Sequence, residues 1–247
     1  MRLDKFIASQ RTDLSRNAVK VLVRKGAVTV DGVKAEKADM HIDENTAVVA
    51  VRGEEIVYKK YIYLMMNKPQ GVVCSTKDGE SQTVLELVPP HLMREGLFPA
   101  GRLDKDTEGF VFLTDDGALA HKMLSPKSHV PKTYFVRLER PWQEDYEQIM
   151  SKGMTIPPEK AGSHEEKCLP AQFKGSGENH HECTLTIHEG KYHQVKRMFA
   201  ALGNRVVYLK RISIGGMALD ESLPLGETLE ILHKDVEKIL TENQPVW

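Results

Sequence analysis

The sequence has few cysteines, no long apolar run and almost no net charge. Its three cysteines, Cys74, Cys168 and Cys183, are odd in number and unevenly spaced, which argues against a disulfide framework and favours a reducing compartment. No stretch reaches the 18 or more apolar residues of a membrane span, and the first residues lack the apolar core of a signal peptide. We therefore expect a cytoplasmic protein with no membrane partner.

Motifs for cofactors and metals are also missing. The sequence contains no Gly-x-x-x-x-Gly-Lys-Ser/Thr phosphate loop, no Gly-x-Gly-x-x-Gly fingerprint and no Cys-x-x-Cys pair. Asp104 with Asp106 could hold Mg²⁺ in a nuclease, as could Asp115 with Asp116, but we expect the second pair to form a turn and a helix N-cap. The candidate zinc ligands are His164, Cys168, His180, His181 and Cys183. Three of them fall within four residues beside a polar loop, which favours an exposed loop over a zinc site. We predict no cofactor and no metal.

The near-zero net charge hides an uneven distribution. The whole chain has 34 Lys and Arg against 35 Asp and Glu, a net charge of −1, which by itself argues against a protein that coats nucleic acid. Residues 1–30, however, hold seven basic and two acidic residues, a net charge of +5, so the remaining 217 residues carry −6. The first thirty residues are therefore the candidate nucleic-acid contact.

Two short helices are predicted within this basic segment. Apolar residues recur with helical spacing at positions 3, 6 and 7, and again at 19, 22 and 23, between the N-cap candidate Ser15 and Gly26. Arg16, Lys20 and Arg24 lie four residues apart and form one basic stripe on the second helix. A strand at 27–30, a turn at 31–32 and a strand at 47–51 complete an α-α-β unit.

A mixed α and β domain is predicted after a polar linker at residues 54–60. Apolar segments predict buried strands at 61–66, 110–114, 134–138, 183–187 and 206–214, and helices at 118–124, 142–151 and 192–202. Residues 157–179 are rich in Gly, Pro, Ser, Glu and Lys, which predicts an exposed loop. The predicted organisation is α+β, with domains at residues 1–58 and 59–235 and a polar C-terminal tail at 236–247.

The most informative segment is a charged turn between Gly101 and Gly109. Glycine permits close backbone approach, and the strand that follows is apolar enough to be buried. Such a turn holds a carboxylate, that of Asp104, at the rim of a rigid sheet. Composition alone equally allows a surface loop whose acidic residues only cap and solvate.

These segments resemble a known family. Gly101-Arg102-Leu103-Asp104 with Thr107 and Gly109 matches the catalytic motif of the pseudouridine synthases of ribosomal RNA. Three further motifs resemble that family in the expected order, at residues 67–71 (Asn-Lys-Pro-Gln-Gly), 132–134 (Lys-Thr-Tyr) and 190–199. Residues 1–50 resemble the S4 RNA-binding module. The resemblance covers residues 1–235 and implies a largely antiparallel, mixed catalytic sheet behind the S4-like domain.

The resemblance implies an isomerase that converts uridine to pseudouridine. The segments 192–199 and 223–227 look most like the small-subunit (RsuA) branch, which implies one uridine of 16S ribosomal RNA, at position 516, as the target. The expected partner is 16S ribosomal RNA or an assembling small ribosomal subunit, and we expect a monomer. Two alternatives stay open: a synthase that acts on 23S ribosomal RNA, and a non-catalytic S4-type ribosome-assembly factor.

The resemblance also assigns roles to individual residues. Asp104 is the catalytic aspartate, as nucleophile or base, and Lys196 is the cation that holds its carboxylate ionised. The target base leaves its stack at a cost of a few kcal/mol, and stacking on Tyr134 recovers about 1–3 kcal/mol. Leu185 or Ile187 is expected to form the apolar floor beneath that base.

Several basic residues are candidate RNA contacts. Arg102, beside the catalytic aspartate, is expected to displace the base or to hold the neighbouring RNA backbone. The stripe of Arg16, Lys20 and Arg24 is expected to dock RNA. The candidate phosphate contacts are Lys68, Lys132, Arg197, Lys210 and Arg211.

Overall fold

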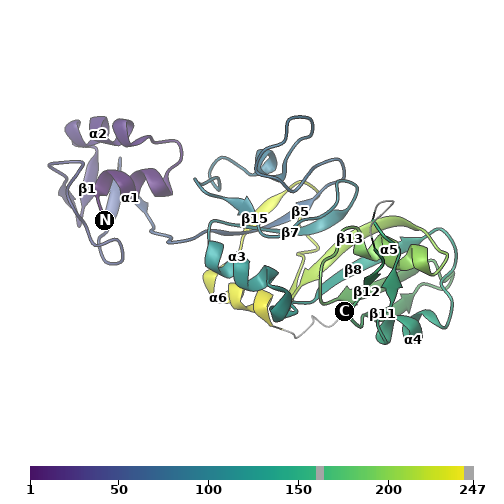
Figure 1. Cartoon of the computed structure of the whole chain (residues 1–247). Coiled ribbons are helices and arrows are strands. Elements are labelled where there is room, and N and C mark those ends of the chain that lie inside the picture. Colours follow the sequence, from purple (N-terminus) through teal and green to yellow (C-terminus); the bar gives the residue numbers. More distant parts are fainter. Residues whose placement is uncertain (160–163, 242–247) are drawn as a thin grey trace. The chain divides into compact units, whose positions relative to one another are not determined.

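The computed structural model describes residues 1–159 and 164–241. The chain forms two compact units, one of residues 1–62 with 88–97 and one of residues 63–87 with the chain from 98 onward (Figure 1). No sequence pattern indicated that residues 88–97 belong to the first unit. Two hydrogen bonds hold them there, from Arg94 Nη2 to the Lys59 carbonyl (3.0 Å) and from Thr12 Oγ1 to the Pro90 carbonyl (3.1 Å). In the part of the chain described, no helix is long and apolar enough to cross a membrane.

The first unit confirms the predicted α-α-β order. Its helices are α1 (Leu3–Gln10) and α2 (Arg16–Arg24), and its sheet has the order β2-β1-β3-β4, with β1 at Val28–Val30, β2 at Val33–Lys34, β3 at Val49–Val51 and β4 at Glu54–Ile56. Ser15 caps α2, because its Oγ accepts a hydrogen bond from the Ala18 amide (3.2 Å). The apolar faces of both helices are buried together with the strands.

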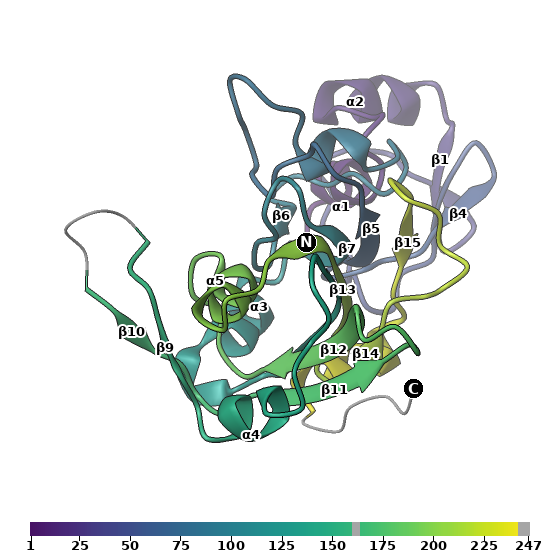
Figure 2. The same cartoon turned by 90° about the vertical axis from the view of Figure 1, so that its right-hand side faces the viewer.

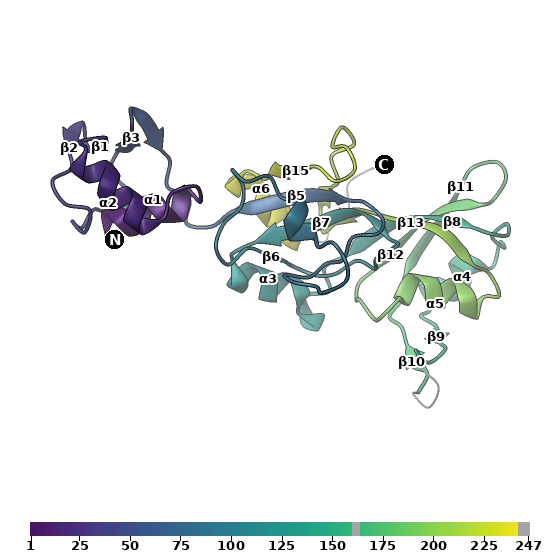
Figure 3. The same cartoon turned by 90° about the horizontal axis from the view of Figure 1, so that it is seen from above.

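The second unit is built on one large sheet with the strand order β11-β12-β8-β13-β7-β5-β15 (Figure 3). Within this sheet β13 pairs with β7 in parallel and the other pairs are antiparallel, which confirms the predicted α+β class. The strands are β5 (Tyr63–Lys68), β6 (Phe98–Pro99), β7 (Glu108–Thr114), β8 (Lys132–Leu138), β11 (Gln172–Ser176), β12 (Glu182–Ile187), β13 (Val206–Ile214), β14 (Met217–Ala218) and β15 (Thr228–Glu230).

Short helices and one small hairpin surround this sheet. The hairpin pairs β9 (Thr155–Ile156) with β10 (Glu166–Lys167). The helices are α3 (Gly117–Leu124), α4 (Tyr146–Ser151), α5 (Gln194–Ala201) and α6 (His233–Val236), with 3₁₀ turns η1 (Val84–Leu87), η2 (Pro126–Ser128) and η3 (Glu237–Leu240). Asp116 caps α3 through bonds from the Ala118 and Leu119 amides, so the second acidic pair forms the expected turn and N-cap.

Helix α5 lies on one side of the sheet, where it contacts β13 and the hairpin strand β9 (Figure 2). The ring of Phe199 on α5 lies 6.5 Å from that of Phe173 on β11, and Phe173 is the cross-strand partner of Leu185. Leu185 in turn pairs with Tyr134 on β8. Directly opposed residues share a face of a sheet, so the side chains of Tyr134 and Leu185 lie on the face that α5 covers.

Two segments expected to be unstructured contain regular structure. In the predicted loop 157–179, β11 pairs with β12 because Phe173 is buried against the rings of Trp142, Tyr146 and Phe199. The predicted tail begins instead with the end of α6 and η3, where Ile239 is fully buried. Both segments were misjudged because single apolar residues within polar stretches reach the core. Residues 160–163 of the loop and 242–247 of the tail lie outside the described residues.

Candidate active site

The turn that carries Asp104 is fixed by the first strand of its unit. The Gly71 amide donates to the Lys105 carbonyl (2.8 Å), and the Thr107 amide closes the turn by donating to the Asp104 carbonyl (3.1 Å). At the end of the turn Gly109 has φ +101°, and a Cβ atom there would collide with the backbone of Arg211. Glycine is therefore required where the turn enters β7 beside β13.

Lys68 holds the same turn through hydrogen bonds to its backbone. Its side chain is fully buried, and Nζ donates to the carbonyls of Thr107 (2.7 Å) and Pro69 (2.9 Å), with the Lys105 carbonyl at 3.4 Å. Burial lowers the pKa of Lys68 below its ordinary value. The expectation that Lys68 contacts phosphate is therefore wrong, because the ammonium is inaccessible and its hydrogen bonds go to backbone carbonyls.

The carboxylate of Asp104 meets two nitrogen atoms from the region around α5. Lys196 Nζ lies 2.9 Å from Oδ2, and His193 Nε2 lies 3.5 Å from Oδ1. Lys196 Nζ also lies 2.6 Å from Oδ1 of Asp106, whose side chain is 70% exposed. Burial alone would lower the pKa of Lys196, but its hydrogen bonds to Asp106 and Asp104 raise that pKa above its usual value. Asp104 itself stays accessible, with a quarter of its side chain exposed.

The start of α5 is built to present Lys196 and His193. His193 is the N-cap residue and adopts a left-handed conformation, with φ +47° and ψ +33°. Arg197 ties down the preceding turn, because its guanidinium donates to the carbonyls of Tyr192 (3.0 Å) and Pro157 (2.9 Å) and pairs with Glu166 (2.6 Å). Arg197 was expected to contact phosphate, but its side chain is only 10% exposed, so its role is to anchor the turn.

Tyr134 lies two strands away from the Asp104 turn. Its cross-strand partner on β13 is Arg211, whose partner on β7 is Gly109. Two strand spacings place the Cα atoms of Tyr134 and Gly109 about 10 Å apart. Leu185 and Ile187 of β12 are buried in register with β8, on the Tyr134 face. This arrangement places apolar side chains and an aromatic ring on one face, close to the turn.

Two cations lie near Tyr134, Lys132 on the same strand β8 and Arg211 opposite Tyr134 on β13. Arg211 is 4% exposed, and its Nε donates to the Phe110 carbonyl (2.7 Å). Lys132 is half-buried, and burial together with the nearby Arg211 lowers the pKa of Lys132 to about 8. Lys132 is therefore still charged at neutral pH, whereas a typical lysine stays charged to a much higher pH.

The other candidate RNA contacts are exposed. Arg102 is exposed in the turn next to Asp104, and the Arg16, Lys20 and Arg24 side chains are exposed along α2 in the first unit. Arg16 has a second task, since its Nη2 lies 2.9 Å from the carboxylate of Asp4, whose side chain is fully buried. Hydrogen bonds from Arg2 and Arg16 hold the pKa of Asp4 below its usual value, although burial opposes this.

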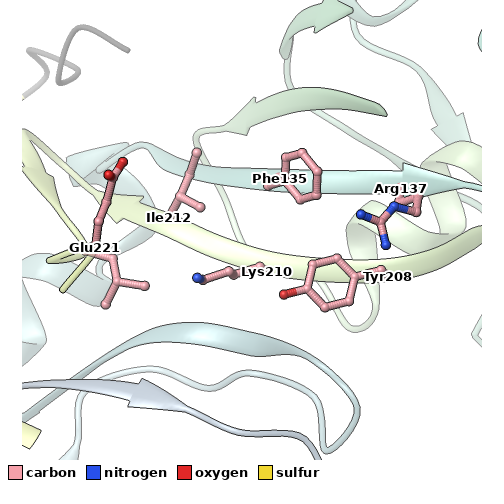
Figure 4. Close-up of a pocket in the computed structure, with 7 residues that line it drawn as sticks. Phe135, Arg137, Tyr208, Lys210, Ile212 and Glu221 are labelled. Atoms are coloured by element: carbon pink, nitrogen blue, oxygen red, sulfur yellow. The ribbon is translucent and has the colours of Figure 1, made fainter. Parts of the chain in front are cut away.

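A hollow of about 560 Å³ lies along β8 and β13 (Figure 4). Because Phe135 lines it and successive residues of a strand point to opposite faces, the hollow lies on the face opposite Tyr134. Two of its polar groups are already paired, because Tyr208 donates to Glu108 (2.6 Å) and Arg137 to Glu182 (2.9 Å). Lys210, a candidate phosphate contact, lines this hollow and so faces away from Tyr134. The hollow is lined by Phe135, Arg137, Tyr208, Lys210, Ile212, Leu219 and Glu221.

Sequence reasoning missed His193 and Asp106 as neighbours of the Asp104–Lys196 pair. Both lay within motifs that had been singled out, but motif spacing does not show which side chain turns toward Asp104. Among the described residues, no group of three or more His, Cys, Asp or Glu is placed to hold a metal ion.

Comparison with known proteins gives consistent matches over both units. Residues 62–201 match the profile of RNA pseudouridylate synthase, and residues 1–48 match the S4 domain. An uncharacterized RNA pseudouridine synthase of Bacillus subtilis, YtzG, is 47% identical over 99% of this chain and 100% of its own length. The ribosomal small subunit pseudouridine synthase A of Vibrio cholerae is 44% identical over 97% of this chain and 99% of its own length. A crystal structure of a pseudouridylate synthase aligns with a TM-score of 0.65 at 39% identity, covering 97% of this chain and 99% of that one.

Proposed function

Because this chain belongs to the RNA pseudouridylate synthase family, and is therefore an isomerase, we propose that it converts a single uridine of small-subunit ribosomal RNA to pseudouridine. The relative from Vibrio cholerae carries a small-subunit name and matches nearly the whole chain at 44% identity, which supports this substrate class. The target position, 516 of 16S ribosomal RNA, stays a prediction. We further propose that the enzyme acts as a cytoplasmic monomer on the RNA or on an assembling small subunit.

The ion pair between Asp104 and Lys196 carries this proposal. The reaction breaks the bond between C1′ of the ribose and N1 of uracil, and then joins C1′ to C5, so no atom is gained or lost overall. It requires an ionised carboxylate beside the sugar. The Lys196 ammonium lies 2.9 Å from Asp104 and places a positive charge beside this carboxylate, and either attack at C1′ or removal of the 2′ proton would use the same carboxylate.

The proposal extends to the roles of four further side chains. Tyr134 stacks on the displaced uracil above the apolar side chains of Leu185 and Ile187, and Arg102 contacts the RNA next to the target. After uracil has turned and bonded through C5, the C5 hydrogen leaves as a proton and N1 gains one. The first unit, with its S4 domain match, supplies RNA affinity through α2.

The test is the Asp104→Asn variant, which keeps the shape of the side chain and removes its charge. We expect pseudouridine formation on 16S transcripts to fall below detection in a carbodiimide primer-extension assay, while RNA affinity stays within about twofold because binding uses other groups. Retained pseudouridine in this variant would refute the assignment of Asp104.

Mapping in cells identifies the substrate. Ribosomal RNA from cells with and without the protein is compared at every pseudouridine. Loss of one pseudouridine from 16S ribosomal RNA is expected, and loss of a 23S site in its place would overturn the small-subunit assignment.

A further inference from the structure

The aromatic pair Tyr192–His193 at the start of α5 has no role in the reaction as described so far. The two rings are stacked, with centroids 3.8 Å apart and an angle of 26° between their planes. The Tyr192 side chain is 55% exposed, and among the Phe, Tyr and Trp residues in the described ranges it is the one with an exposed side chain. An exposed aromatic ring can stack on a nucleic-acid base, so its position beside the site makes Tyr192 a candidate RNA contact.

The pair is joined directly to the catalytic group. His193 Nε2 lies 3.5 Å from Oδ1 of Asp104, so the stack runs from solvent to the carboxylate through two adjacent residues. His193 achieves this in a left-handed backbone conformation that is unfavourable for a residue with a side chain. Residues held in such conformations concentrate at functional sites, where the surrounding structure maintains them.

Hydrogen bonds hold the backbone of the pair in place, and the stack holds the Tyr192 ring against that of His193. Arg197 donates to the Tyr192 carbonyl (3.0 Å), the Lys191 amide donates to Gln194 Oε1 (2.9 Å), and the Arg197 amide donates to the His193 carbonyl (2.9 Å). A ring fixed in advance loses little conformational entropy when a ligand stacks on it. The pair is therefore a preformed platform.

The charges around the platform indicate which part of RNA it receives. The neighbouring cations already have acidic partners, Lys191 with Glu189 (3.4 Å), Arg197 with Glu166 (2.6 Å) and Lys196 with Asp104 (2.9 Å). The remaining group that RNA could contact is the exposed face of the Tyr192 ring, opposite His193. An aromatic face binds a base by stacking and does not attract a phosphate. When the target uridine leaves its stack, each neighbouring base loses a stacking partner and can gain this ring in exchange.

We propose that Tyr192, backed by His193, stacks on a base adjacent to the target uridine and so holds the RNA open beside Asp104. This proposal rests on the proposed function, because it assumes an RNA substrate with a flipped uridine. It assigns Tyr192 and His193 to substrate positioning, and it leaves the uracil itself to Tyr134.

The test compares three variants with the wild-type enzyme. Tyr192→Phe keeps the ring, Tyr192→Leu keeps apolar area without the ring, and Leu225→Ala removes an apolar side chain of similar exposure (52%) elsewhere. We expect Tyr192→Leu to raise KM for the 16S fragment about tenfold with kcat within about threefold, because stacking contributes to RNA binding. Tyr192→Phe and Leu225→Ala should stay within twofold of wild type.

A spectroscopic measurement separates stacking from other causes. The fluorescent base 2-aminopurine replaces the nucleotide before the target uridine in one fragment and the nucleotide after it in a second fragment. The target is the uridine predicted at position 516 of 16S ribosomal RNA. One of the two probes should lose more fluorescence on binding wild type or Tyr192→Phe than on binding Tyr192→Leu. A Tyr192→Leu enzyme with unchanged KM and quenching, or with a loss in kcat alone, would overturn the platform. Failure of the wild type to form pseudouridine would instead overturn the proposed function, and the probe would still report on stacking.

Discussion

Two lysines near the Asp104 turn carry the same charge but have different partners. Lys196 lies against the carboxylates of Asp104 and Asp106, where solvent can reach the group. Lys68 is fully buried, and its ammonium is held by backbone carbonyls of the turn. The first lysine sets the charge of the site, and the second sets its geometry.

Replacing Lys68 with Met should loosen the catalytic turn. The substitution leaves the carbonyls of Pro69 and Thr107 without their donor, and the buried Thr107 carbonyl, once unsatisfied, costs about 1–3 kcal/mol. We expect the free energy of unfolding to fall by at least about 1–3 kcal/mol, measured by urea denaturation, together with a lower kcat. Lys105→Met, at an exposed lysine of the same turn, is the control and should change stability by less than about 0.5 kcal/mol. Equal stability of the two variants would contradict the role given to Lys68.

The depressed pKa of Lys132 predicts a pH dependence of RNA binding. With a pKa of about 8, Lys132 is charged at pH 7 and mostly neutral at pH 9, so a phosphate contact would be lost as the pH rises. We expect RNA affinity to weaken several-fold between pH 7 and pH 9, measured by filter binding. Lys132→Arg stays charged over this range and should weaken less. Identical pH profiles would show that Lys132 does not contact RNA.

At the scale of elements, the site depends on how β5 and α5 approach the turn before β7. Residues 67–71 at the end of β5 fix the turn through Lys68 and the Gly71 amide, and α5 delivers Lys196 and His193 to Asp104. The motifs at 67–71 and 190–199 are thus the supports of the Asp104 turn. Their separation along the chain gives no hint of this contact.

Helix α2 carries the main expectation for RNA docking. Lys20 and Arg24 are exposed on one stripe, whereas Arg16 on the same stripe also pairs with the buried Asp4. We expect the double variant Lys20→Ala/Arg24→Ala to reduce the slope of log affinity against log salt by up to about one unit per lost phosphate contact. Arg16 is left intact because its removal would also affect the fold of the first unit.

The control for the helix variant removes two positive charges elsewhere in the same unit. Lys34→Ala/Lys37→Ala alters exposed residues outside α2 and should leave the salt slope nearly unchanged. An unchanged slope in the α2 variant would mean that its stripe is only solvated surface. An equal effect of both double variants would mean that RNA responds to total charge and does not dock on α2.

At the scale of the whole molecule, the charge distribution agrees with an enzyme that acts on one site of one RNA. The net charge is −1, yet residues 1–30 carry +5. A uniformly basic surface would strengthen non-specific binding, whereas a local basic segment adds affinity where the S4 domain match lies. The similarity to pseudouridine synthases of Bacillus subtilis and Vibrio cholerae covers 97–99% of the chain, so it extends through both units.

The sequence by itself determined most helices and strands of the core, with β11 and η3 as exceptions, the α+β class and the motif that carries Asp104. These features depend on local spacing of apolar residues, on caps such as Ser15 and on glycines in turns, all of which can be read within a few residues. The tertiary structure decided which charged side chains are accessible. Lys68 and Arg197 look like any surface cation in the sequence, but long-range packing places them on the backbone carbonyls of Thr107 and Pro157, while His193 is brought to Asp104. These three contacts join residues far apart in the chain, so no local pattern encodes them.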